Sequence, residues 1–118
     1  MKSLAVAVAL AASIAAAHAQ EVYKIGNGVA APVPIHQVKP EYTQEALAAR
    51  IEGVVALDTI VKADGSVGDV TVAKSLDNVL GLDQQAVKAA KAWRFQPGTK
   101  DGKPVAVSVT LEMRFTLK

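Results

Sequence analysis

The last stretch of the chain constrains the fold most strongly, because apolar and polar side chains alternate along it without a break. The odd positions from Val105 to Leu117 are Val, Leu, Met or Phe, whereas the even positions from Ala106 to Lys118 are small, polar or charged. Successive side chains of a strand point to opposite faces of a sheet, so this pattern predicts a strand with one face on a core and the other in water. Such a strand would span roughly 43 Å at about 3.3 Å per residue. We therefore expect part of one edge to lack a strand partner.

Two further strands are predicted upstream, from Val54 to Lys62 and from Val67 to Ala73, because both runs are rich in β-branched residues. They are separated by Ala63-Asp64-Gly65-Ser66. An Asp-Gly pair between β-branched runs favours a tight hairpin turn, since glycine adopts positive φ without steric cost. The sequence therefore predicts an antiparallel hairpin centred on Asp64-Gly65.

Two helices complete the expected fold. Thr43 can cap a helix from Gln44 to Arg50, and a second helix should follow Gly81. Apolar residues recur at helical spacing in the second helix and form a stripe that should pack on the sheet and make the tryptophan a core residue. The stripe consists of Leu82, Ala86, Ala89, Ala90 and Trp93. The predicted fold class is α+β, with two helices packed on a three-stranded antiparallel sheet.

The N-terminal part divides into two segments. A short basic start, an apolar run from Leu4 to Ala17 and the triplet Ala17-His18-Ala19 are typical of a secretory signal peptide over residues 1–19. An uncleaved inner-membrane anchor is less favoured, because the apolar run is shorter than the roughly 20 residues that span a bilayer core. Residues 20–34 are rich in Gly and Pro and are expected to form a flexible lead-in without core residues. The folded domain should cover residues 35–118.

Composition excludes several classes of function. The chain has no cysteine, and its formal net charge of +2 is too small for the dense basic face of a nucleic-acid-binding protein. His36 would be the only histidine after signal cleavage and is interpreted as a loop residue rather than a metal ligand or catalytic base. The carboxylates at Asp64, Asp83 and Asp101 are expected to lie in solvated turns or caps. We therefore expect no enzyme, no metal and no cofactor.

Six short motifs, in this order and at this spacing, resemble the C-terminal domain of the TonB family from about residue 35 to the end of the chain. They are Lys39-Pro40-Glu41-Tyr42, Glu52-Gly53-Val54-Val55, Ala63-Asp64-Gly65-Ser66-Val67, Gly81-Leu82-Asp83, Trp93-Arg94-Phe95-Gln96-Pro97 and Asp101-Gly102-Lys103-Pro104-Val105. The resemblance implies a periplasmic domain whose last strand lies at a sheet edge. In that family the edge captures the TonB box, an extended segment of outer-membrane transporters, as an added strand.

By motif match, partner binding would fall on the segment before the first helix and on the final strand. The implied site residues are Lys39, Pro40, Glu41, Tyr42, Val107, Ser108, Val109, Thr110, Leu111, Glu112, Met113 and Arg114. An exposed strand offers free N–H and C=O groups with which an extended chain can pair. The same edge leaves an alternative open, in which an envelope structural or assembly protein pairs with itself, as a homodimer, or with another envelope protein.

Overall fold

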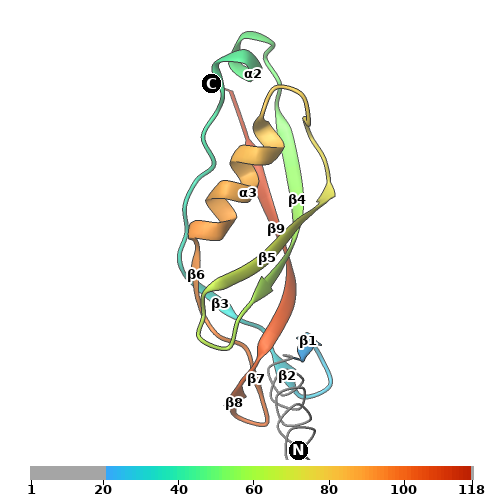
Figure 1. The fold of residues 1–118 in the computed structure, drawn as a ribbon, viewed down its shortest axis with the longest axis vertical. Coiled ribbons are helices and arrows are strands. Elements are labelled where there is room, and N and C mark those ends of the chain that lie inside the picture. The colour runs from blue at the N-terminus through green and yellow to red at the C-terminus, as the bar shows by residue number, and fades with distance from the viewer. Residues whose placement is uncertain (1–20, 118) are drawn as a thin grey trace, which may run out of the picture.

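The structure is a computed structural model and describes residues 21–117. Its centre is a four-stranded sheet with the order β1-β9-β4-β5 (Figure 1). These strands are β1 (Val22–Lys24), β9 (Ala106–Phe115), β4 (Gly53–Val61) and β5 (Val67–Lys74). β4 is antiparallel to β9 and to β5, whereas β1 is parallel to β9. The three predicted strands are present, but the expectation of a three-stranded, wholly antiparallel sheet is wrong, because the lead-in adds β1.

The β4–β5 hairpin turns at Gly65, as the sequence predicts. Gly65 has φ +88°, and its N–H donates to the carbonyl oxygen of Lys62 over 2.9 Å. The Asp64 carboxylate accepts from the N–H of Ser66 at 2.9 Å, which closes the turn. The tip also docks on the rest of the molecule, because the N–H of Phe95 donates to the carbonyl oxygen of Gly65 at 2.9 Å.

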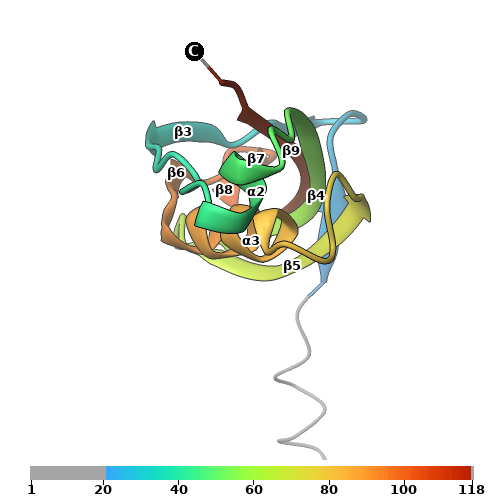
Figure 2. The same ribbon diagram turned by 90° about the horizontal axis from the view of Figure 1, so that it is seen from above.

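The sheet curves around one long helix, α3 (Leu82–Ala92), as Figure 2 shows. Four residues of the predicted stripe on α3 are buried, and they meet the inward side chains of β4 and β9 in a single core. Leu111, Met113 and Phe115 of β9 are buried there while Glu112 and Arg114 are exposed, which confirms the predicted alternation for this half of the strand. At the start of β9 the alternation is lost, because Ala106 is buried as well as Val107. The buried helix residues are Leu82, Ala86, Ala89 and Ala90.

The other helix is short and lies at one end of the molecule (Figure 1). It is α2 (Gln44–Ala48), and its predicted cap is confirmed, since the Thr43 hydroxyl accepts from the N–H of Ala46 at 3.2 Å. The helix ends before the predicted Arg50 because that residue has φ +57°, which an α-helix cannot contain. The Thr43 hydroxyl also donates to the carbonyl oxygen of Leu80 at 2.6 Å and so ties α2 to the loop before α3.

The lead-in contains more structure than the sequence suggests. After β1, the strand β2 (Val29–Ala30) pairs with β7 (Thr99–Lys100), which in turn pairs with β8 (Lys103–Pro104). Then β3 (Val33–His36) pairs with β6 (Arg94–Gln96). Val29 is only 8% exposed, so the expectation that the lead-in contributes nothing to the core is wrong. His36 lies in a strand rather than in a loop.

Two buried carboxylates organise the loop between β5 and α3. Asp77 accepts hydrogen bonds from the backbone N–H groups of Val79, Leu80 and Leu82 at 2.8–3.1 Å. Asp83 accepts from the N–H groups of Leu76 and Asp77. The expectation of a solvated cap is therefore wrong for Asp83, which is 6% exposed, and the loop backbone and the Ser75 hydroxyl satisfy its two oxygens.

The predicted signal peptide lies outside the described residues. Neither helix described between residues 21 and 117 has the length and hydropathy that a membrane-spanning helix requires.

Candidate functional site

One long edge of the main sheet is only partly covered. On one side, β9 pairs with β4 along its length, from Val61↔Val107 to Gly53↔Phe115. On the other side, β1 covers only the stretch from Ala106 to Ser108. From Val109 to Phe115 this side has no strand partner among residues 21–117. We call the stretch Val109–Phe115 the open edge.

Pairing with β1 excludes the first two residues of the predicted binding strand from the open edge. Val107 pairs with Tyr23 and Ser108 pairs with Lys24, so the β1 backbone already occupies that side of both residues. Val107 is also fully buried, which leaves its side chain no surface for a partner. The predicted positions whose backbone has no strand partner on this side run from Val109 to Arg114, although the side chains of Leu111 and Met113 are buried in the core.

The segment 37–42 runs beside the end of β9 and forms two shallow grooves with it. The first groove has a volume of about 390 Å³ and extends over Glu112, Met113 and Arg114 of the strand. The second has a volume of about 400 Å³ and continues past Arg114 to Phe115 and Thr116. Both are lined by Lys39 and Pro40. The structure thus brings together the two halves of the site that the sequence placed about seventy residues apart.

Two predicted residues of segment 37–42, Tyr42 and Glu41, differ from Lys39 and Pro40 in the residues around them. The Tyr42 hydroxyl donates to the carbonyl oxygen of Ile51 at 2.6 Å, and its ring packs edge-on against Phe115 with 5.3 Å between centroids. Partial desolvation raises the pKa of Tyr42 above its usual value. Tyr42 therefore lines the second groove, and its contacts with Ile51 and Phe115 also stabilise the fold. Glu41 lies apart from both grooves and lines a hollow against Lys88 of α3.

Trp93 packs against the hydrophobic core, as the sequence predicts, but it also borders this site. It is half-buried, lines the first groove, and its indole Nε1 donates to the carbonyl oxygen of Val38 at 2.9 Å. Its ring lies 5.9 Å from that of Phe95. The indole N–H is the feature that sequence reasoning overlooked, because a tryptophan donor needs a polar partner and so favours the margin of a core.

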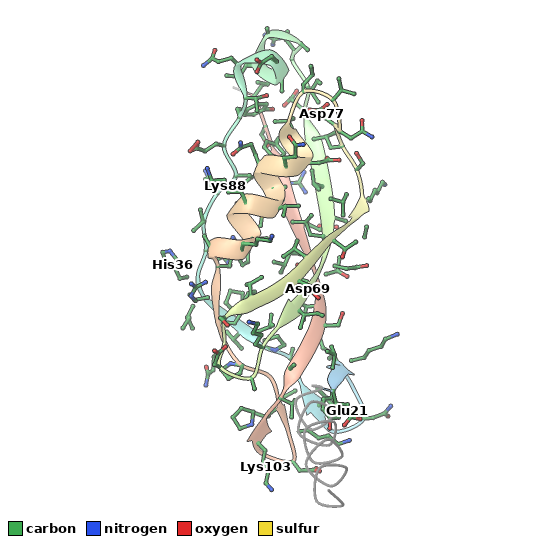
Figure 3. All side chains as sticks on the ribbon, viewed as in Figure 1. Glu21, His36, Asp69, Asp77, Lys88 and Lys103 are labelled. Carbon is green, nitrogen blue, oxygen red and sulfur yellow. The ribbon has the colours of Figure 1, made fainter. Side chains whose placement is uncertain are left out.

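The chemistry available at the site is that of a polypeptide interface. The strand offers backbone N–H and C=O groups, and the grooves add the cations of Lys39 and Arg114 together with the carboxylate of Glu112. On the outer face, the Thr110 hydroxyl donates to Asp58 across the β4–β9 pair at 3.2 Å. Among residues 21–117 no three His, Cys, Asp or Glu side chains cluster in a way that could hold a metal. His36 projects outward from the flank of the molecule (Figure 3).

A groove-bordered sheet edge on a small α+β scaffold defines a protein-interaction domain, and comparison with known sequences agrees. Residues 38–117 match the family described as Gram-negative bacterial TonB protein C-terminal. The chain is 37% identical over 78 residues to Protein TonB of Xanthomonas campestris pv. campestris, covering 66% of this chain and 34% of the relative. It is 35% identical over 82 residues to Protein TonB of Vibrio cholerae serotype O1, covering 70% of this chain and 33% of that protein.

A solved structure shows the same fold. The solution NMR structure of the Pseudomonas aeruginosa TonB CTD superimposes with a TM-score of 0.61 at 26% identity, covering 84% of this chain and 97% of that one. The chain belongs to the TonB C-terminal domain family. That membership confirms the predicted α+β class and places the chain in a family of non-enzymatic interaction proteins. The chain spans about a third of the length of the relatives named above.

Proposed function

We propose that this chain binds the TonB-box segment of outer-membrane transporters in the periplasm, as a strand added along the open edge Val109–Phe115, and so serves TonB-dependent transport. The observation that carries the proposal is the open edge itself, bordered by grooves that segment 37–42 forms with β9. An extended peptide laid on this edge would pair with β9 through its backbone. It would also reach Lys39 and Pro40 with its side chains.

Backbone pairing alone gives little net affinity. About five added hydrogen bonds contribute a net ~1 kcal/mol each. Ordering five peptide residues costs roughly 1 to 2 kcal/mol each and cancels that gain. Side-chain contacts must therefore supply the surplus, and the grooves are the place where β9 offers them.

The charges of the grooves favour one kind of segment. Lys39 and Arg114 line both grooves, while Glu112 lines only the first. The second groove therefore combines two cations with the rings of Tyr42 and Phe115. A partner segment with an acidic residue over Arg114 would complement these cations, because charge-assisted hydrogen bonds are stronger than neutral ones.

The test is an NMR titration of the isotope-labelled protein with a TonB-box peptide that carries an acidic residue. Shifts should concentrate at Val109–Phe115 and near Lys39. Arg114→Glu should weaken binding by roughly tenfold or more, because it removes one favourable charge pair of about 1.4 kcal/mol and also places a carboxylate beside the acidic residue of the peptide. Lys103→Glu makes the same charge change on β8, at the opposite end of the molecule from α2 (Figures 1 and 3), and should leave binding unchanged. Shifts confined to α3 and β5 would refute strand addition at this edge.

A second copy of the chain is the alternative occupant, and the same free backbone from Val109 to Phe115 favours it. Self-pairing predicts a dimer whose fraction rises with protein concentration and falls when peptide is added. Sedimentation at several concentrations distinguishes the two, since the transporter-binding function requires the edge of the monomer to be free.

A further inference from the structure

β1 lies on the same side of β9 that the proposed partner would use. Its three residues run parallel to β9, with Val22, Tyr23 and Lys24 opposite Ala106, Val107 and Ser108. A partner strand and β1 cannot pair with the same backbone groups. β1 therefore limits the accessible edge to seven of the ten residues of β9.

Few contacts hold β1 in place. Val22 is 41% exposed, Lys24 is exposed, and Tyr23 is only half-buried. None of the three belongs to the hydrophobic core cluster. Apart from its backbone pairing, Tyr23 has an exposed hydrogen bond to Glu21 at 3.2 Å and the Lys100 ammonium 4.9 Å from its ring centroid. Segments with few buried contacts open at low free energy, so β1 should detach more readily than any other strand of the main sheet.

The turn that follows β1 is anchored to β2 rather than to β1. Gly26 and Val29 exchange two backbone hydrogen bonds at 3.1 and 3.2 Å, and the exposed Ile25 is the only residue between this turn and β1. Val29 is buried and β2 pairs with β7. β1 can therefore swing away from β9 while β2 stays in place.

We infer that β1 is an exchangeable internal strand, which occupies the start of the partner-binding edge and is displaced by a partner segment long enough to span all of β9. This inference rests on the proposed strand addition and specifies the length of the segment. A partner segment that pairs only with Val109–Phe115 binds beside β1, whereas a segment that spans all of β9 replaces β1.

The surroundings of β1 also specify what a displacing segment needs. The position opposite Val107 is filled by the Tyr23 ring, which the Lys100 ammonium contacts. A cation near an aromatic face is a favourable contact that the incoming strand must replace. A long partner should therefore carry an aromatic residue at the end that lies beside Val107.

The experiment compares two synthetic peptides cut from one TonB-box segment, one of seven and one of ten residues, the longer with an aromatic residue at the added end. Both are titrated against the wild-type protein and against a triple variant with Val22→Gly, Tyr23→Ser and Lys24→Gly, which removes the side chains that favour β1. Ile25→Ser is the matched control, because Ile25 is 54% exposed and lies outside the β1–β9 ladder.

Binding of the ten-residue peptide should tighten by roughly three- to tenfold in the triple variant, because a site that is open in a tenth of molecules binds about tenfold more weakly. Binding of the seven-residue peptide should not change, and Ile25→Ser should behave as wild type. In the wild type, the long peptide should move the amide signals of Tyr23 and Lys24 to unstructured positions. Equal affinities in wild type and triple variant, with Tyr23 unshifted, would overturn the exchange while leaving strand addition intact. If neither peptide shifts Val109–Phe115, the proposed function itself fails.

Discussion

The indole Nε1 of Trp93 donates a 2.9 Å hydrogen bond to the carbonyl oxygen of Val38, and this contact joins the end of α3 to the segment that borders the open edge. Trp93→Phe keeps an aromatic ring but removes the donor, so it should lower the free energy of unfolding by about 1 kcal/mol. It should also weaken peptide binding, because segment 37–42 loses the hydrogen bond that holds it to the end of α3. Urea unfolding and the NMR titration measure the two effects. If Trp93→Phe has wild-type stability and affinity, the hydrogen bond does not hold the segment in its binding position.

Gly65→Ala should destabilise the domain more than its turn geometry alone explains. A Cβ at Gly65 would lie 2.1 Å from the carbonyl oxygen of Phe95, so the hairpin tip must move away from β6. Gly102→Ala is the matched control, since Gly102 has a similar φ of +80° but no atom within 4 Å of its Cβ position. We expect a loss of about 1 kcal/mol for Gly102→Ala, from backbone strain, and roughly 2 to 3 kcal/mol for Gly65→Ala. Equal losses would mean that the close approach to Phe95 costs nothing.

Acid should weaken the loop that Asp77 holds. The backbone N–H groups of Leu80, Val79 and Leu82 hold the pKa of this carboxyl below its usual value, and they outweigh its desolvation. A depressed folded-state pKa gives stability that is present above the unfolded pKa of about 3.9 and is lost as pH falls through the folded value. Thermal unfolding from about pH 7 down to pH 2 should therefore show a loss of stability below roughly pH 4.

Asp77→Asn should be less stable at neutral pH and should lose less on acidification. Its amide nitrogen cannot accept the hydrogen bond that Leu82 donates to the second carboxylate oxygen. Asp69→Asn is the control, because Asp69 is exposed on β5, away from this loop (Figure 3). An Asp77→Asn protein with the same pH profile as wild type would assign the acid sensitivity to another group, such as Asp64, whose pKa is lowered by Ser66.

The Thr43 hydroxyl should stabilise both α2 and the loop before α3. Its hydroxyl accepts from the N–H of Ala46 and donates to the carbonyl oxygen of Leu80. Thr43→Val preserves the shape but removes both bonds, and should cost about 1 to 2 kcal/mol, the upper range for an N-cap. Thr43→Ser keeps the hydroxyl and should stay within about 0.5 kcal/mol of wild type. Equal stability of the two variants in denaturant unfolding would contradict the cap.

The sequence predicts best the elements whose own residues follow a regular local pattern. The β4–β5 hairpin follows from Asp64-Gly65 between β-branched runs, and β9 follows from its alternation. By contrast β1, β2 and β3 have two to four residues each, among Gly and Pro, and owe their existence to partners far along the chain. No periodicity can be read from so few residues, so the covering of Val107 and Ser108 could not be foreseen.

The candidate site shows the same division. The family-like motif at Lys39–Tyr42 and the alternation in β9 indicate two halves of a site, and the grooves bring Lys39 and Pro40 against Arg114. No pattern in the sequence indicates that Glu41 lines a hollow with residues of α3 and lines neither of the two grooves. The sequence also could not show that Asp83 is buried, because the donors that satisfy it are the Ser75 hydroxyl and two backbone N–H groups of a loop without regular structure.

The long ladder between β4 and β9 has a consequence for the order of folding. It joins Gly53 to Phe115, so its contacts close a loop of several tens of residues, whereas the β4–β5 hairpin closes locally. Contacts that are distant in sequence form late, because the entropy of loop closure must be overcome first. We expect the hairpin and α3 to form before β9 docks. The strand that carries the open edge would then dock after the hairpin and before β1, which pairs only with β9, so a chain in which β9 has not yet docked could not bind a partner there.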